Sequence, residues 1–376
     1  MIPVYKPYLP ANALKYAHEA LDSTWISSQG KFLPMVTEKL QDLLGTKYVI
    51  PLNNGTSACH LVAKSLHRFC KPSSGKKKII VPNNVYVAAW NAFLFDNNYQ
   101  LIPIDADLKT WNVDMYRLDV MIGRYPDADI LVVHNIGNII NVPELQRKYP
   151  HSHFVEDNCE GFLGKYEGRP TGTASIASSI SFFGNKNVTS GEGGAFITTS
   201  EDLYQYAKCV QGQGQSETRF VHKELGYNYR MSNVQAAILY GQLEVLPDIL
   251  SMKHEVFETY RKAFGGREDI KIQAIPDNTQ NANWMFGVHV PGQLMYEAAE
   301  LYFKMHGIEI RPMFYPLHAH EHLKYNPDII EFQNDSNANI LNKKSFILPS
   351  YPELTKEEQQ RIIDEVNGYV RGVNGP

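Results

Sequence analysis

Short apolar runs alternate with helical patterns through the first two thirds of the chain. Apolar or β-rich runs predict buried strands at 78–82, 101–104, 129–133, 153–156, 180–183 and 194–198. Between them, apolar residues recur at helical spacing over 58–69, 85–95 and 142–148. Strands that alternate with helices are typical of a mainly parallel sheet covered on both faces. The pattern therefore predicts an α/β fold.

The pattern changes at about Ser232, where long helical patterns begin. A further strand is predicted at 285–288, a helix at 294–306 and a terminal helix after Thr355. We expect a domain boundary near residue 245, which divides the chain into a large domain, 1–245, and a smaller α+β domain, 246–376.

Charge and composition narrow the class of partners. The 376 residues include 36 basic and 40 acidic side chains, giving a formal net charge of −4. This balance lacks the basic excess that binding to a nucleic-acid backbone requires, so no nucleic-acid partner is expected. One basic cluster, Lys76, Lys77 and Lys78, is predicted to be a solvated loop.

No segment of the sequence is typical of a membrane, export or metal site. Apolar runs stay well short of 18 residues, and residues 1–7 lack a signal-peptide pattern. We therefore expect no membrane partner and a cytoplasmic location. The cysteines are far apart and lack the spacing of a zinc motif, so no metal site is predicted: Cys59, Cys70, Cys159 and Cys209.

Three segments carry residues suited to chemistry, and the first opens a predicted helix. In Asn54-Gly55-Thr56-Ser57, the glycine permits close approach of a ligand. The free amides and the helix dipole suit a phosphate group. The alternative is an ordinary helix cap formed by Thr56 or Ser57.

The second segment, Val155 to Glu160, places Asp157 and Glu160 after a predicted strand. Ligands of parallel sheets bind at the carboxyl ends of strands, where a carboxylate can pair with a protonated ring nitrogen or a metal. The alternatives are a solvated loop acid and a helix cap.

The third segment, residues 181–194, holds Lys186 between an aromatic strand and a glycine-rich turn. Partial desolvation there would lower the pKa of the lysine, as a Schiff-base lysine requires. The alternative is a surface lysine in a hairpin. The order of the three segments is the order expected of a pyridoxal-phosphate site.

Four motifs, at 21–30, 182–194, 226–231 and 311–318, resemble those of the sugar-nucleotide aminotransferases named for DegT, DnrJ, EryC1 and StrS. The resemblance runs nearly end to end. It implies the aspartate-aminotransferase-like fold, which is pyridoxal-phosphate fold type I. That fold has a large, mostly parallel seven-stranded sheet domain and a smaller α+β C-terminal domain.

The resemblance also implies a role for individual residues. Lys186 would bond covalently to pyridoxal 5′-phosphate and move the reacting proton, and Asp157 would keep the pyridine nitrogen protonated. Tyr86 would stack on the ring, with core packing as the alternative, and Glu160 would contact the phenolic oxygen. Four residues would hold the phosphate: Gly55, Thr56, Ser57 and Ser181. Asn228 would reach that phosphate from a neighbouring subunit, which implies a homodimer with shared active sites.

The implied reaction transfers an amine from glutamate to C4 of a nucleotide-linked 4-keto-6-deoxyhexose, giving a 4-amino-4,6-dideoxy sugar of the perosamine or viosamine type. The nucleotide, GDP, UDP or dTDP, stays open. Substrate contacts are expected from Trp25, Arg311, Tyr315 and His318, although the last three also suit interdomain packing.

Three other functions are alternatives. A 3-amino-sugar aminotransferase is disfavoured by the motif around Trp25. A 3-dehydratase of the family carries histidine where this chain has Lys186. A non-catalytic sugar-nucleotide-binding regulator is disfavoured because the catalytic positions are filled. The chain also departs from the family's usual residues in Asn135-Ile136-Gly137-Asn138 and at Asn141, Asn158, Cys159 and Gly161.

Overall fold

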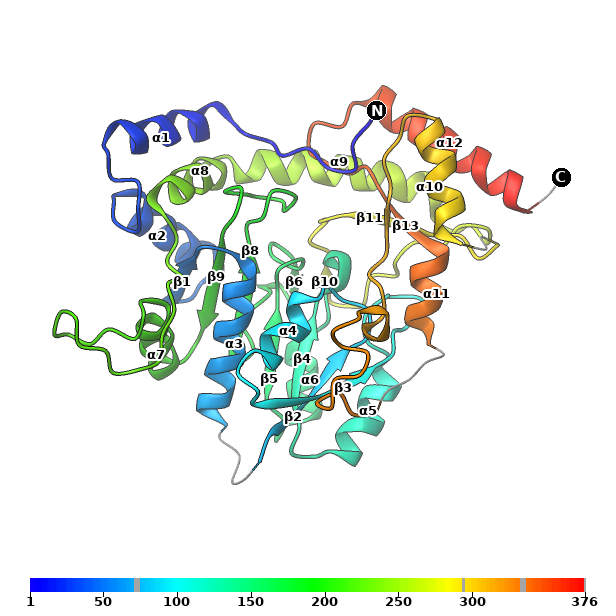
Figure 1. The fold of residues 1–376 in the computed structure, drawn as a ribbon. Coiled ribbons are helices and arrows are strands. Elements are labelled where there is room, and N and C mark those ends of the chain that lie inside the picture. Colours follow the sequence, from blue (N-terminus) through cyan, green and yellow to red (C-terminus); the bar gives the residue numbers. More distant parts are fainter. Residues whose placement is uncertain (71–74, 293–294, 332–335, 375–376) are drawn as a thin grey trace.

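A seven-stranded sheet forms the centre of the larger part of the molecule (Figure 1). The computed structural model describes residues 1–70, 75–292, 295–331 and 336–374. The strand order is β1 (Tyr48–Leu52), β9 (Gly194–Thr198), β8 (Ala177–Ser181), β5 (Phe154–Asp157), β4 (Asp129–Val133), β2 (Lys77–Pro82) and β3 (Tyr99–Ile104). Within this sheet β9 is antiparallel to both of its neighbours, and the remaining pairs are parallel. The predicted α/β fold with a mostly parallel seven-stranded sheet is confirmed.

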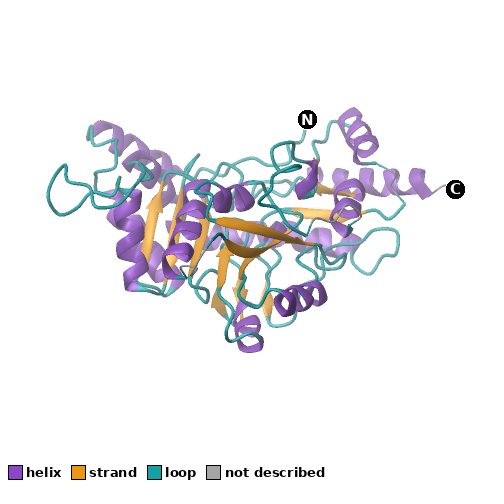
Figure 2. Ribbon diagram, turned by 60° about the horizontal axis from the view of Figure 1, so that its bottom comes forward, coloured by secondary structure: helices purple, strands orange, loops and turns teal. Residues whose placement is uncertain are grey.

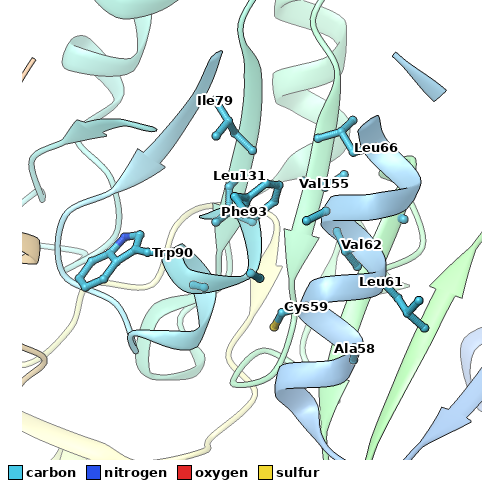
Figure 3. Packing of buried hydrophobic residues seen from close by; sticks show 14 of the residues in the cluster. Ala58, Cys59, Leu61, Val62, Leu66, Ile79, Trp90, Phe93, Leu131 and Val155 are labelled. Carbon is cyan, nitrogen blue, oxygen red and sulfur yellow. The ribbon is translucent and has the colours of Figure 1, made fainter. Parts of the chain in front are cut away.

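Alternate residues of the central strands enter two different cores. Ile79 and Leu131 pack on one face with α3 (Gly55–Phe69) and α4 (Ala88–Leu94) (Figure 3), and α7 (Glu201–Gln211) joins the same buried cluster. Ile80 and Ile130 pack on the other face, with α5 (Met115–Arg124) and α6 (Val142–Lys148). Because side chains alternate across a strand and both faces are covered, these strands are continuously apolar. Figure 2 shows helices on both sides of the strands.

Helices also link the large sheet to a second group of strands. Near the start of the chain, α1 (Ala11–Asp22) and α2 (Phe32–Leu44) pack on α8 (Asn233–Glu244). The next helix, α9 (Leu246–Phe264), runs from α8 toward the C-terminal elements (Figure 1). None of the helices in the described part of the chain has the length and apolarity needed to cross a membrane.

The second sheet has the order β11 (Phe286–His289), β13 (Ser345–Leu348) and β12 (Arg311–Pro312), and all its pairs are antiparallel. It packs with α10 (Tyr296–Met305) and α12 (Lys356–Asn374), and α11 (Asn337–Lys344) leads into β13. Ile2 joins the same buried cluster, so the N-terminal segment lies against the C-terminal part. Small elements complete the fold: η1 (Asn135–Gly137), β6 (Lys165–Tyr166), β7 (Arg169–Pro170), β10 (Thr279–Gln280) and η2 (Leu317–Ala319).

Some local predictions were wrong. The basic cluster was predicted to be a loop, but Lys77 and Lys78 belong to β2. The Lys77 Nζ atom lies 2.7 and 2.8 Å from the two carboxylate oxygens of buried Asp129, and this pairing offsets the burial of both charges. The strand predicted at 180–183 is β8, which ends at Ser181. The predicted start of α10 at residue 294 lies outside the described residues.

Candidate active site

A cavity of about 680 Å³ opens at the carboxyl ends of the parallel strands. Nine of the predicted site residues line it: Gly55, Thr56, Tyr86, Asp157, Glu160, Ser181, Lys186, Arg311 and Tyr315. Trp284 and Met313, which belong to the C-terminal part, line it as well. The cavity therefore lies between the large sheet and the second sheet.

Four predicted residues are not among those that line this cavity. Ser57 is buried in α3, and its backbone N–H donates to the side chain of the capping residue Asn54 at 2.8 Å. Trp25 is 61% exposed in the segment between α1 and α2. His318 lies in η2, and His320 lines the cavity instead.

The fourth is Asn228, which forms an isolated β-bridge with Gly212. Its two neighbours are held by a partly buried polar cluster. The hydroxyl of Tyr227 donates to Asp96 at 3.1 Å, and the hydroxyl of Tyr229 lies 3.0 Å from Nδ1 of His60. The loop that carries Asn228 is thus fixed to α3 and to the segment that follows α4.

Asp157 ends β5 and is only 7% exposed. Its Oδ1 atom accepts hydrogen bonds from the backbone N–H of Cys159 at 3.0 Å and from the hydroxyl of Ser179 at 3.3 Å. Its Oδ2 atom accepts from the Cys59 thiol at 3.6 Å. These bonds fix the orientation of the carboxylate at the edge of the cavity.

Lys186 lies in the loop after β8, where its N–H closes a turn by donating to the carbonyl of Phe183 at 2.9 Å. The carbonyl of Lys186 accepts a hydrogen bond from the hydroxyl of Tyr5 at 2.7 Å. Its Nζ atom lies 3.8 Å from the ring centroid of Trp284, and the indole N–H of Trp284 donates to the carbonyl of Asn185 at 2.9 Å. Two residues remote in sequence thus hold the backbone and side chain of the lysine loop.

Glu160 is buried beside the same lysine, and burial raises its pKa to about 7. The nearby Lys186 ammonium and the hydrogen bond from the N–H of Ile136 at 2.7 Å both oppose that rise. Ile136 has a φ of 55°, which is strained for a β-branched residue. The strained backbone presents its amide to Glu160.

The helix N-terminus at Gly55 approaches β8 closely. A Cβ atom at Gly55 would lie 2.7 Å from the Cβ of Ser181 and 2.8 Å from its Oγ. The first amides of a helix have no partner within the helix, and the Asn54 side chain satisfies that of Ser57. The amides of Gly55 and Thr56 therefore remain suited to an anion in the cavity.

The outer wall of the cavity carries aromatic and cationic side chains. Tyr86 is 59% exposed, and its ring centroid lies 6.1 Å from that of Phe314. Arg311 lies on β12, where its Nη2 atom is 3.7 Å from a carboxylate oxygen of Glu309. Because this contact is long and half exposed, the guanidinium can bind an anionic ligand.

Two of the positions where the chain departs from the family's usual residues, Gly161 and Asn135, are closely packed against their neighbours. A Cβ atom at Gly161 would lie 2.6 Å from the Cβ of His134, so the space of a side chain is already filled. The Asn135 side chain donates to the carbonyls of Asn84 and Trp111 at 3.1 and 2.9 Å. These contacts rigidify the segment before Ile136.

Sequence reasoning missed Trp284 and Tyr5, which belong to segments without a motif. The available sequence signal was the position of Trp284, an aromatic residue just before the strand predicted at 285–288. Contact with Lys186 depends on how the two sheets pack, which no local pattern encodes.

The chain belongs to the DegT/DnrJ/EryC1/StrS aminotransferase family, whose profile matches residues 7–367. The family and enzyme class predicted from the motifs are thereby confirmed. The chain is 31% identical over 371 residues to GDP-perosamine synthase of Escherichia coli O157:H7, with 98% of each chain covered. It is also 31% identical to GDP-perosamine synthase of Caulobacter vibrioides, with 96% of each chain covered.

The same fold occurs in a solved structure of E. coli GDP-4-keto-6-deoxy-D-mannose-3-dehydratase with bound hydrated pyridoxal phosphate. The TM-score is 0.86, with 99% of each chain covered and 22% identity. This likeness supports the predicted fold type and concerns the fold alone.

Proposed function

We propose that this protein is a pyridoxal-phosphate-dependent aminotransferase that places an amine on C4 of a nucleotide-linked 4-keto-6-deoxyhexose, with glutamate as the amine donor. One observation carries the proposal: Lys186 and Asp157 line one cavity at the carboxyl ends of the parallel strands. Membership of the aminotransferase family and the extended similarity to GDP-perosamine synthases support it.

The residues around the cavity fit pyridoxal phosphate. The volume of about 680 Å³ is in the range of ligand pockets. Because Gly55 has no Cβ, the first turn of α3 packs directly on Ser181, and the amides of Gly55 and Thr56 lie at the cavity wall, where a phosphate group can approach. The buried Asp157 carboxylate suits a protonated ring nitrogen.

Each residue has a defined task in this proposal. Pyridoxal phosphate supplies a reactive aldehyde and an electron-withdrawing ring when bound. The Nζ atom of Lys186 would hold the cofactor covalently and would carry the proton that moves during transfer. Asp157 would hold the ring nitrogen protonated, and Tyr86 would cover the ring. Glu160, whose raised pKa allows a proton to remain on its carboxyl, would contact the phenolic oxygen.

The sugar nucleotide enters from the side lined by Arg311 and Tyr315. Arg311 supplies a cation for a phosphate of the nucleotide, and Tyr315 offers a ring and a hydroxyl. We assign no direct contact in this chain's own cavity to Trp25, His318, Ser57 or Asn228. Asn228 instead acts on the site of a neighbouring subunit, which makes the active form a homodimer.

Comparing three substrates tests the proposal. The GDP-, UDP- and dTDP-linked 4-keto-6-deoxyhexoses are each incubated with the protein, pyridoxal phosphate and glutamate. We expect an amino sugar with the amine on C4, identified by NMR, and the highest kcat/KM with the GDP-linked substrate. An amine on C3 would favour the 3-aminotransferase alternative. No amino sugar from any substrate would favour a non-catalytic binder.

Loss of the lysine gives a second test. Lys186→Ala should abolish multiple turnover and leave the fold intact, as measured by thermal unfolding. Transamination by this variant at the wild-type rate would contradict the proposed role of Lys186.

A further inference from the structure

Two thiols and a carboxylate meet in the wall of the cavity. The Sγ atom of Cys59 lies 4.0 Å from the Sγ of Cys159 and 3.6 Å from Oδ2 of Asp157. The three ligand atoms lie within 4.8 Å of one another. Cys59 comes from α3, about a hundred residues before the other two, so no sequence spacing predicts this group.

The distances resemble the edges of a tetrahedral metal site. With Zn–S bonds of about 2.3 Å and a Zn–O bond of about 2.0 Å, tetrahedral angles place two sulfurs about 3.8 Å apart and a sulfur and an oxygen about 3.5 Å apart. The observed separations of 4.0 and 3.6 Å are close to these values. Small shifts of side chains therefore suffice to enclose an ion.

The surroundings also suit a cation. Hydrogen bonds to Oδ1 of Asp157 leave Oδ2 turned toward the thiols. Cys59, Cys159 and Asp157 all line the cavity, so an ion can reach them although Cys59 is only 4% exposed. Two thiolates and a carboxylate carry three negative charges, which a divalent ion and the neighbouring Lys186 ammonium balance.

We propose that Cys59, Cys159 and Asp157 form a binding site for Zn²⁺ or a similarly thiophilic divalent ion in the cofactor-free protein. Paired thiolates select such ions over Mg²⁺ or Ca²⁺. The ion and pyridoxal phosphate exclude each other because both require Asp157; this second statement rests on the proposed function.

Binding releases protons. The hydrogen bond with Cys59, burial and the charge of Asp157 raise the pKa of the Cys159 thiol, whereas the Lys186 ammonium lowers it. These groups face the thiol from α3, from β5 and from the loop after β8. Because the metal binds the thiolate form, its affinity rises with pH.

Titration of Cd²⁺ into the cofactor-free protein tests the site. The ion gives a thiolate-to-metal charge-transfer absorption in the ultraviolet, and we expect it to saturate at one ion per chain. Cys59→Ala and Cys159→Ala should each weaken binding at least about tenfold, since each removes one of three ligands. Thermal unfolding of each variant checks its fold. Cys209→Ser is the matched control, and it should bind like wild type.

A second cluster, Cys70, Asp129 and His153, also has ligand atoms within 4.8 Å of one another. Cys70→Ser therefore serves as another control and should keep the absorption. Loss of the absorption in Cys70→Ser, with normal binding by both alanine variants, would overturn the proposal. So would the absence of any thiolate absorption in wild type.

Competition is measured separately, without turnover. Pyridoxal phosphate added to the Cd²⁺-loaded protein should displace the ion and remove the ultraviolet absorption. Simultaneous binding of both would contradict mutual exclusion. A protein that binds Cd²⁺ at this site and never binds pyridoxal phosphate would refute the proposed function and leave the metal site standing.

Discussion

The ammonium nitrogen of Lys186 lies 3.8 Å from the ring centroid of Trp284. Lys186 follows a strand of the large sheet, whereas Trp284 lies just before β11 of the second sheet, separated from it by Met285. A cation over an indole ring is attracted by the ring quadrupole, and more strongly where water is excluded. The position of the lysine therefore depends on the packing of the two sheets against each other.

Replacement of Trp284 tests this dependence. Trp284→Ala removes both the ring face and the hydrogen bond to Asn185. Since a cation–π contact contributes about 0.5–2 kcal/mol, kcat should fall about 2- to 30-fold. Trp284→Phe keeps a ring face and should lose less. Steady-state kinetics of both variants checks this, and unchanged kcat in Trp284→Ala would contradict it.

Tyr5→Phe tests the contact of the N-terminal segment with the lysine loop. The variant removes the hydroxyl that donates to the carbonyl of Lys186 at 2.7 Å. A lost hydrogen bond of this kind should cost about 1 kcal/mol of unfolding free energy. Chemical denaturation measures the loss. Tyr8→Phe, in a tyrosine that packs near α2 and α8, is the matched control, and an equal loss there would argue against a specific role for Tyr5.

Gly55→Ala tests the close approach of α3 to β8. The added Cβ would lie 2.7 Å from the Cβ of Ser181, so one of the two backbones must shift. We expect a loss of about 1–3 kcal/mol in unfolding free energy and weaker binding of pyridoxal phosphate.

Second substitutions in the Gly55→Ala protein identify the cause of that loss. Adding Ser181→Gly removes the opposing Cβ and should restore part of the stability. Adding Ser181→Ala keeps that Cβ and should not. Thermal unfolding of the two double variants measures this, and equal stability of the two would exclude the clash as the cause.

The chemistry-bearing residues were predictable to different degrees, for physical reasons. Lys186 and Asp157 were predictable because each stands next to a strand that is recognisable from the local sequence. Asp157 is the last residue of β5, and Lys186 lies in the loop after β8. Ser57 was predicted beside them, but it is buried in α3 and is not among the residues that line the cavity. Tyr5 enters the site through tertiary packing, which neither periodicity nor motif spacing describes.

The same distinction applies to the fold. Strands β2 and β4 were predicted because residues 79–82 and 130–133, which make up most of the two strands, are buried on both faces and continuously apolar. β1 was missed because it is short and contains Pro51, which lacks a donor and argues against a central strand. The proline is tolerated because β1 lies at the edge of the sheet.

Glu160 makes the stability of the cofactor-free protein depend on pH. Its pKa is raised to about 7 in the folded protein, so between about pH 4.5 and 7 the folded state binds more protons than the unfolded state. The free energy of unfolding should therefore fall as the pH rises through this window. Glu160→Gln removes the titration and should be more stable than wild type by about 3 kcal/mol at pH 8.

Denaturation curves at pH 4.5 and pH 8 measure this difference. The two proteins should be similar at the lower pH, where the wild-type carboxyl is protonated in the folded state and about half protonated in the unfolded state. A constant difference across the range would show that the effect of the substitution does not come from titration of Glu160.

The most direct test of the central claim is the visible absorption of the purified protein loaded with pyridoxal phosphate. Addition of glutamate should shift the absorption of the bound cofactor. Addition of GDP-4-keto-6-deoxymannose should then reverse the shift with one amino sugar formed per active site. Lys186→Ala should complete no such cycle. A wild-type spectrum unchanged by glutamate, or a complete cycle in Lys186→Ala, would contradict the account.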